Sequence, residues 1–167
     1  GALNNTKNQS ALLAALNEMK LNAEVIFLGD GINKKPLIDN AKEIDRTTNI
    51  VFKGRVTRNL TIEHMLEADV SISLSKGEGL TIAVLESMYA GCFQILSIIP
   101  PHKEISPPSR RCLFVDASRK ADIVSSLNFV KENIGLIRAE RVTSREYTMN
   151  NFGLDNMLKE YMKVYDS

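Results

Sequence analysis

The strongest constraint on the fold is a recurring pattern of short apolar runs separated by segments with helical periodicity. The apolar runs do not alternate with polar residues, which is typical of strands buried on both faces of a parallel sheet. Strands of this kind that alternate with helices form βαβ units. The pattern therefore predicts an α/β domain with a doubly wound, mainly parallel sheet and helices on both faces. The expected strands are 23–28, 49–52, 69–74, 93–99 and 112–115.

Helix signals lie between these strands. Thr6 is a suitable N-cap for the first helix, and Pro36 suits the first turn of the second. The prolines between positions 100 and 108 predict a stiff, irregular segment. The expected helices are 7–20, 33–47, 60–68, one that follows Thr81 and ends at Gly91, one that begins at Ser118, and a tail over 139–165 that is interrupted near 150–153.

Length and composition narrow the class of protein. A chain of 167 residues corresponds to a single domain, 1–167. Its net charge of +1 argues against a broad basic surface for nucleic acid. No apolar run approaches the ~20 residues of a membrane span, and no signal-peptide pattern is present. We therefore expect a cytoplasmic protein in which Cys92 and Cys112 are reduced. Because the chain starts at Gly1 without an initiator Met, we interpret it as a fragment of a longer protein.

The segment from Ser73 to Gly91, SLSKGEGLTIAVLESMYAG, concentrates the functional signals. An apolar strand leads into a Gly-Glu-Gly turn and then into a helix that is apolar almost all the way round, which predicts a buried helix. Glu86 lies in the middle of that helix, and Glu78 lies in the turn before it. A buried, unpaired carboxylate is costly, so Glu86 requires a partner.

The turn itself predicts a ligand. Gly77 and Gly79 allow the backbone to approach a bound group closely, and the amides that open the helix suit a phosphate. A carboxylate near phosphates is better placed against hydroxyl groups, and Glu86 lies roughly 7.5 Å further along the helix axis than Thr81. A nucleotide sugar fits this arrangement. The alternative interpretation makes Glu78 an exposed turn residue and pairs Glu86 with a Lys or Arg from elsewhere.

Glu78 and Glu86, separated by seven residues, resemble the EX7E motif of retaining glycosyltransferases of family 4. The order of the surrounding blocks is similar to that in the C-terminal, donor-binding half of GT-B enzymes, whose fold is Rossmann-like. The resemblance covers nearly the whole chain. The matching blocks are FLGDG (27–31), NIVFKGRV (49–56), ADVSISLS (68–75) and PPHKEI (100–105).

The resemblance implies a role for each matching residue. Glu78 is the expected catalytic residue and binds hydroxyls of the donor hexose. Glu86 holds the ribose hydroxyls, and Lys7 takes the place of the family's diphosphate-binding lysine. The expected substrate-binding residues are Lys7, Gly54, Arg55 and Val56 (the last three lining the base), Gly79, Leu80 and Thr81 (near the sugar and the diphosphate), and Glu86.

One position departs from the family pattern. Ala2 stands where these enzymes usually carry an arginine five residues before the lysine, and arginine is the side chain suited to bidentate phosphate binding. The family is metal-independent, so we expect no metal and no cofactor.

As a whole, the resemblance implies the donor-binding domain of an enzyme that transfers a hexose from a UDP- or GDP-linked sugar to a glycan or lipid-linked acceptor with retention, as in polysaccharide biosynthesis. The N-terminal acceptor domain is missing from this sequence, so the isolated domain should be inactive. Peripheral association with the cytoplasmic face of a membrane is compatible with such a role. Two alternatives stay open, a non-catalytic nucleotide-sugar-binding or assembly module and a GT-B-fold epimerase of nucleotide sugars.

The remaining candidates have simpler explanations. His64 and His102 are not spaced as metal ligands with the cysteines, so surface or capping roles are expected. Gly29-Asp30-Gly31 lacks the third glycine of a dinucleotide fingerprint and reads as a turn. The pair Arg110-Arg111 is expected in a solvated loop, and Glu104 is either a family position or an exposed acid.

Overall fold

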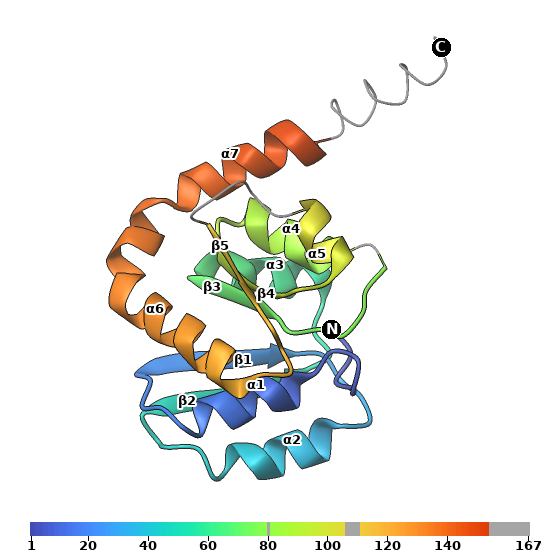
Figure 1. The fold of residues 1–167 in the computed structure, drawn as a ribbon. Helices are drawn as coiled ribbons and strands as arrows, with labels where there is room; N and C mark the ends of the chain where they lie inside the picture. The colour runs from blue at the N-terminus through green and yellow to red at the C-terminus, as the bar shows by residue number, and fades with distance from the viewer. Residues whose placement is uncertain (80, 106–110, 154–167) are drawn as a thin grey trace.

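The computed structural model describes residues 1–79, 81–105 and 111–153 (Figure 1). Strands and helices alternate along these residues as the sequence predicts. The elements are α1 (Gln9–Leu16), β1 (Ala23–Leu28), α2 (Lys34–Ala41), β2 (Thr48–Gly54), α3 (Arg58–Glu67), β3 (Val70–Ser73), α4 (Ile82–Tyr89), β4 (Phe93–Ser97), α5 (Pro100–Ile105), β5 (Cys112–Val115), α6 (Lys120–Ala139) and α7 (Arg141–Phe152).

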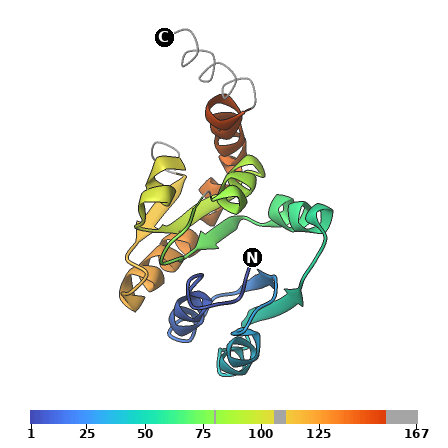
Figure 2. The same ribbon diagram turned by 90° about the vertical axis from the view of Figure 1, so that its right-hand side faces the viewer.

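Every strand pairing is parallel, which confirms the predicted fold class. The strands form a two-stranded sheet, β1-β2, and a three-stranded sheet, β3-β4-β5. The first residues of the chain lie between the two sheets (Figure 2). The amino group of Gly1 donates to the carbonyl of Leu28 at 2.5 Å, and the amide of Lys76 donates to the carbonyl of Thr6 at 2.8 Å. The N-terminal segment therefore connects the carboxyl ends of β1 and β3.

Strand β4 shows that both faces of its sheet are covered. All its residues are buried, and side chains alternate between faces along a strand. Phe93 and Ile95 belong to the main core cluster, together with residues of α1 and α6. Leu96, on the opposite face, packs with Val84 of α4 and Ile105 of α5. Helices on both faces of a parallel sheet are what the apolar strand pattern predicts.

Several element ends differ from the prediction, and one helix was not predicted. Helix α1 begins at Gln9 after Asn8, whose φ is 56°, rather than after Thr6, because the Asn4 carbonyl and side chain accept the amides of Asn8 and Lys7 in a turn before the helix. Helix α2 ends at Ala41, earlier than expected. The predicted irregular segment over 100–105 is the short helix α5, because proline is tolerated in a first helical turn, where amides lack intrahelical partners.

The prediction that α4 is buried all round is wrong. Ile82 is 53% exposed and Tyr89 is 45% exposed, so one face of the helix is open. The helix is followed by Gly91 at φ 90°, as expected for a glycine beyond a helix end. The end of α7 at Phe152 agrees with the predicted interruption, and the rest of the predicted tail, 154–165, lies outside the described residues.

Arg111 was expected in a solvated loop, and that expectation is wrong. Its side chain is buried, and its guanidinium donates to the carbonyls of Ile137 and Gly91 and to Ser144. It thereby ties the start of β5 to α6 and α7. Arg110 lies outside the described residues.

Both cysteines are free thiols, as predicted. Burial raises the pKa of Cys92 to about 11 and the pKa of Cys112 to about 12, so both are protonated at neutral pH. No helix among the described residues combines the length and apolar character needed to cross a membrane.

Candidate functional site

A cavity of about 930 Å³ lies at the carboxyl ends of β3, β4 and β5. Its wall includes Ser75 after β3, Ser97 at the end of β4 and Asp116 after β5. Asn8 and residues of α1 close the other side. Ligands of doubly wound α/β domains bind at this edge of the sheet, where loops meet helix N-termini.

Lys7 and Glu78 meet beside this cavity. Lys7 Nζ lies 2.5 Å from Glu78 Oε1 and 2.7 Å from Oε2. Ser75 Oγ also donates to Oε1, at 2.5 Å. Burial raises the pKa of Glu78, but the hydrogen bonds from Lys7 and Ser75 lower it more, so the net pKa lies below its ordinary value. Glu78 is therefore a carboxylate at neutral pH, and it is not the exposed turn residue of the alternative interpretation.

The loop between β3 and α4 leaves open space. A Cβ atom added to Gly77 or Gly79 would meet no other atom within 4 Å, so neither glycine is required by packing of the described chain. Thr81, the N-cap of α4, is 5% exposed. Its hydroxyl has no hydrogen-bond partner among the described residues. A buried polar group without a partner is costly, and functional sites are where such groups are tolerated.

Glu86 has a protein cation as its partner. Arg58 Nη2, at the start of α3, donates to Glu86 Oε1 at 2.6 Å. The Glu86 side chain is 25% exposed and that of Arg58 is 76% exposed. The sequence suggested a buried carboxylate at position 86, but the structure leaves it partly exposed. The pairing matches the alternative interpretation of Glu86. Nothing in the sequence pattern singled out Arg58, which lies 28 residues away.

The expected Gly54-Arg55-Val56 loop begins at Gly54, the last residue of β2, at the carboxyl end of that strand. Gly54 has a φ of 71°, and its carbonyl accepts the amide of Gly29 at 2.7 Å. Arg55 is exposed. Asp30 forms an ion pair with Lys34 in the turn after β1, which supports the interpretation of 29–31 as a turn.

Ala2 is exposed, and its carbonyl accepts a hydrogen bond from Gln9 Nε2 at 2.8 Å. Leu80 lies outside the described residues. The structure thus brings Lys7 and Glu78 into contact and joins Glu86 to Arg58, while the predicted roles of these residues toward a ligand stay predictions.

His102 was expected in a surface or capping role, and the expectation of a surface position is wrong. Its side chain is completely buried, and its ring contacts Ser73 and Ser97. Burial lowers its pKa below the ordinary value. His64 is also shielded, and its Nδ1 lies 3.8 Å from Glu67. Within the described ranges, no cluster of His, Cys, Asp and Glu side chains is arranged to hold a metal ion.

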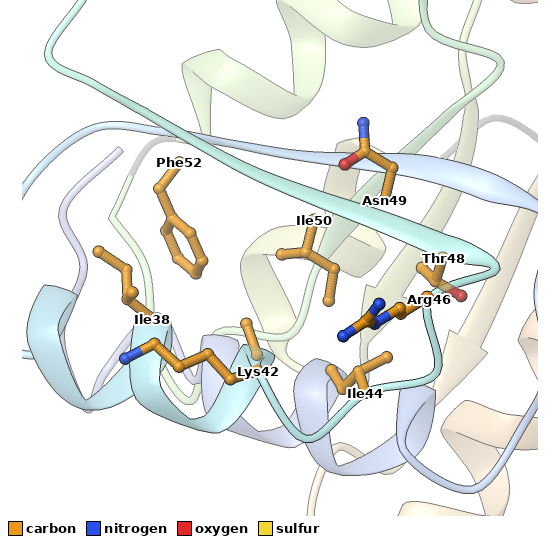
Figure 3. A pocket seen from close by; sticks show the side chains of 9 residues that line it. Ile38, Lys42, Ile44, Arg46, Thr48, Asn49, Ile50 and Phe52 are labelled. Carbon is orange, nitrogen blue, oxygen red and sulfur yellow. The ribbon is translucent and has the colours of Figure 1, made fainter.

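A second cavity, of about 360 Å³, lies apart from these residues, between α2 and the outer strand β2 (Figure 3). Ile50 and Phe52 of β2 lie opposite Ile38 of α2, and Lys42 and Arg46 carry charge to its margin. None of the predicted site residues lines this groove.

Comparison with protein families gives a match over residues 1–147 to the family described as glycosyl transferases group 1. Comparison with curated proteins finds no match.

Solved structures with a similar fold include the catalytic domain of cholesterol-alpha-glucosyltransferase from Helicobacter pylori, with a TM-score of 0.77 and 19% identity over 90% of this chain and 94% of that one. Anabaena HepE in complex with UDP and glucose has a TM-score of 0.82 and 14% identity over 99% of this chain and 46% of that one. Sucrose-phosphate synthase from Thermosynechococcus elongatus has a TM-score of 0.80 and 16% identity over 98% of this chain and 42% of that one. This chain thus spans less than half the length of the latter two proteins.

Proposed function

The chain belongs to the glycosyl transferases group 1 family, and from that premise we propose that it is the nucleotide-sugar-binding domain of a retaining hexosyltransferase. The donor is a sugar linked to a nucleoside diphosphate. Transfer requires an acceptor-binding domain beyond this chain, and the acceptor is a glycan or a lipid-linked glycan.

The observation that carries the proposal is the buried hydroxyl of Thr81 at the N-terminus of α4. The first amides of a helix have no intrahelical acceptors and favour an anion. A phosphate oxygen there would accept hydrogen bonds from both the hydroxyl and the amides. The open space beside Gly77 and Gly79 gives a ligand room to approach these donors.

Lys7 and Glu78 contact different parts of the ligand. Lys7 supplies the positive charge for the diphosphate, while Glu78 supplies acceptors for sugar hydroxyls. In the ligand-free chain each neutralises the charge of the other. Ligand binding would replace this ion pair by a contact of Lys7 with the diphosphate and a contact of Glu78 with the sugar. The same charge that binds the diphosphate stabilises it as a leaving group.

The remaining predicted site residues contact the ribose, the base and the sugar. Glu86 turns from Arg58 to the ribose hydroxyls, and the Gly54-Arg55-Val56 loop lies against the base. Gly79 and Leu80 provide backbone contacts to the sugar. Binding needs neither a metal nor a cofactor, because Lys7 and the α4 amides carry the charge of the diphosphate. The complexes of Anabaena HepE with UDP support uracil as the first base to test.

Calorimetry of the chain with UDP, GDP and ADP tests the proposal. We expect binding in the millimolar range or tighter, with UDP-glucose distinguished from UDP through Glu78. In a Glu78→Gln variant, UDP should bind at least as tightly, because Lys7 no longer has to leave a carboxylate, while the added affinity due to glucose is lost. No binding of any of the three diphosphates at millimolar concentration would contradict the proposal.

Ala2 favours a second candidate, a non-catalytic module that binds nucleotide sugars weakly and serves assembly. It places no charge where the family usually has an arginine. Activity assays of the longer protein separate the two, because Glu78→Gln abolishes transfer if this domain is catalytic and leaves the transfer activity of the longer protein unaffected if it is a non-catalytic module.

A further inference from the structure

His102 is completely buried, and the proposed contacts to the donor do not account for it. Its Nδ1 lies 3.0 Å from the carbonyl oxygen of Ser97, the last residue of β4. Its Nε2 lies 3.3 Å from the hydroxyl of Ser73, the last residue of β3. The ring therefore joins the carboxyl ends of two neighbouring strands at the candidate site.

A chain of hydroxyls leads from this ring to Glu78. Ser73 Oγ lies 3.4 Å from Ser75 Oγ, and Ser75 Oγ donates to Glu78 Oε1 at 2.5 Å. The hydroxyl of Ser97 donates to the carbonyl of Ser75 at 2.5 Å, so the backbone of Ser75 is tied to the end of β4. Ser75 and Ser97 are 1% and 2% exposed, so water does not replace these contacts.

Counting protons shows which charge state of His102 satisfies the chain. The carbonyl of Ser97 can only accept, so Nδ1 carries a proton. In the neutral ring, Nε2 then takes the single proton of Ser73, and none is left between Ser73 and Ser75, because Ser75 donates to the carboxylate. In the protonated ring, Nε2 donates to Ser73, Ser73 to Ser75, and Ser75 to Glu78. Only the protonated ring provides one proton for every contact. In the neutral ring, which burial and Lys7 favour in the ligand-free chain, the 3.4 Å contact between Ser73 and Ser75 has no proton.

Burial and two charged groups act on the pKa of His102 in opposite directions. Burial lowers the pKa of His102 most, while the hydrogen bond with Ser97 and the charge of Glu78 raise it and the charge of Lys7 lowers it. The hydrogen-bond partners of the ring on β3 and β4 are the serines Ser73 and Ser97, and the charged groups that act on its pKa are Glu78 and Lys7. Lys103 and Glu104 on α5 itself are exposed.

We propose that His102 is a proton-coupled positioning residue: when a diphosphate draws Lys7 away from Glu78, His102 takes up a proton and, through Ser73 and Ser75, holds the Glu78 carboxylate toward the sugar. This inference rests on the proposed function for the identity of the ligand. The coupling between Lys7, Glu78 and His102 is a property of the chain alone and can be tested without a ligand.

Nuclear magnetic resonance of the imidazole signals tests the coupling. The chain has only the histidines His64 and His102, so a His64→Gln background leaves a single ring to follow. In that background, Lys7→Met should raise the pKa of His102, and Glu78→Gln should lower it. A Lys42→Met variant on the surface of α2 is the control and should leave the titration unchanged. Equal titration curves for the Lys7, Glu78 and control variants would overturn the proposal.

Calorimetry with UDP-glucose in buffers of different ionisation enthalpy tests the ligand step. We expect net proton uptake on binding near neutral pH, which a His102→Gln variant abolishes because its amide can reach Ser73 but cannot titrate. Binding without proton uptake by the wild-type chain would overturn the proposal. Absence of binding together with the Lys7→Met shift would instead contradict the proposed function and leave the coupling standing.

Discussion

Lys7 Nζ contacts both carboxylate oxygens of Glu78, at 2.5 and 2.7 Å, across 71 residues of sequence. The contact joins the segment before α1 to the loop after β3. Both residues were singled out for a ligand, and each is now the other's counter-ion. Ligand affinity and the strength of this ion pair should therefore be linked.

Replacing Lys7 by Met should weaken binding of a nucleoside diphosphate about tenfold or more, because a hydrogen bond to a charged group is lost. The free energy of unfolding should also fall, by about 1 kcal/mol or less, because solvent screens the pair at the Lys7 side chain, which is 34% exposed, while the Glu78 side chain, 12% exposed, keeps Ser75 as a partner. Calorimetry and urea denaturation measure the two effects. The matched Lys42→Met variant should bind like the wild type, and an equal loss in both variants would contradict a specific role for Lys7.

Replacing Thr81 by Val should separate stability from binding. Valine has nearly the shape of threonine, and it removes a buried hydroxyl that has no partner in the described chain. We expect the free energy of unfolding to stay the same or rise by about 1 kcal/mol, while affinity for the diphosphate falls about fivefold. A loss of stability with unchanged affinity would show that the hydroxyl has a structural role instead.

Glu78 should stabilise the fold in a pH-dependent way. Its pKa in the folded chain lies below the ordinary value of 4.5, so its contribution is present above that pH and is lost as the pH falls through the folded pKa. Urea denaturation of the wild type and of Glu78→Gln at several pH values measures this. The difference between the two should be constant near neutrality and shrink below pH 4.5. A difference that is independent of pH would contradict the ionised carboxylate.

Arg58→Ala should increase affinity for a nucleoside diphosphate about twofold to threefold, because Glu86 no longer has to leave a partner before it binds ribose. The ion pair is exposed on the arginine side and is worth about 1 kcal/mol or less. Glu86→Ala should have the opposite effect, and the double variant should resemble Glu86→Ala. If Arg58→Ala weakened binding instead, the arginine itself would contact the ligand.

The fold was predictable from the sequence because buried strands are short apolar runs that can be recognised by their composition. The expected runs 23–28 and 112–115 coincide with β1 and β5, and the others differ from the observed strands only at their ends. Helix α5 was missed because a proline pair usually marks irregular structure, yet both prolines fall in its first turn, where they are tolerated.

The site was predictable where a local motif exists and not where partners come from distant segments. Glu78 and Thr81 stand out in a short stretch, and family resemblance adds Lys7. The partnership of Arg58 with Glu86, the buried state of His102 and the anchoring role of Arg111 depend on contacts between residues that no periodicity relates. The apolar composition of α4 was also misleading, because most of its residues are apolar and yet Ile82 and Tyr89 are exposed.

The most direct test of the account is a crystal structure of the chain with bound UDP. We predict that the diphosphate lies at the N-terminus of α4, within hydrogen-bond distance of Thr81 Oγ1 and of Lys7 Nζ, and that Lys7 has left Glu78. Ribose should lie beside Glu86. A nucleotide bound elsewhere, for example in the groove between α2 and β2, with the Lys7–Glu78 pair intact, would contradict it.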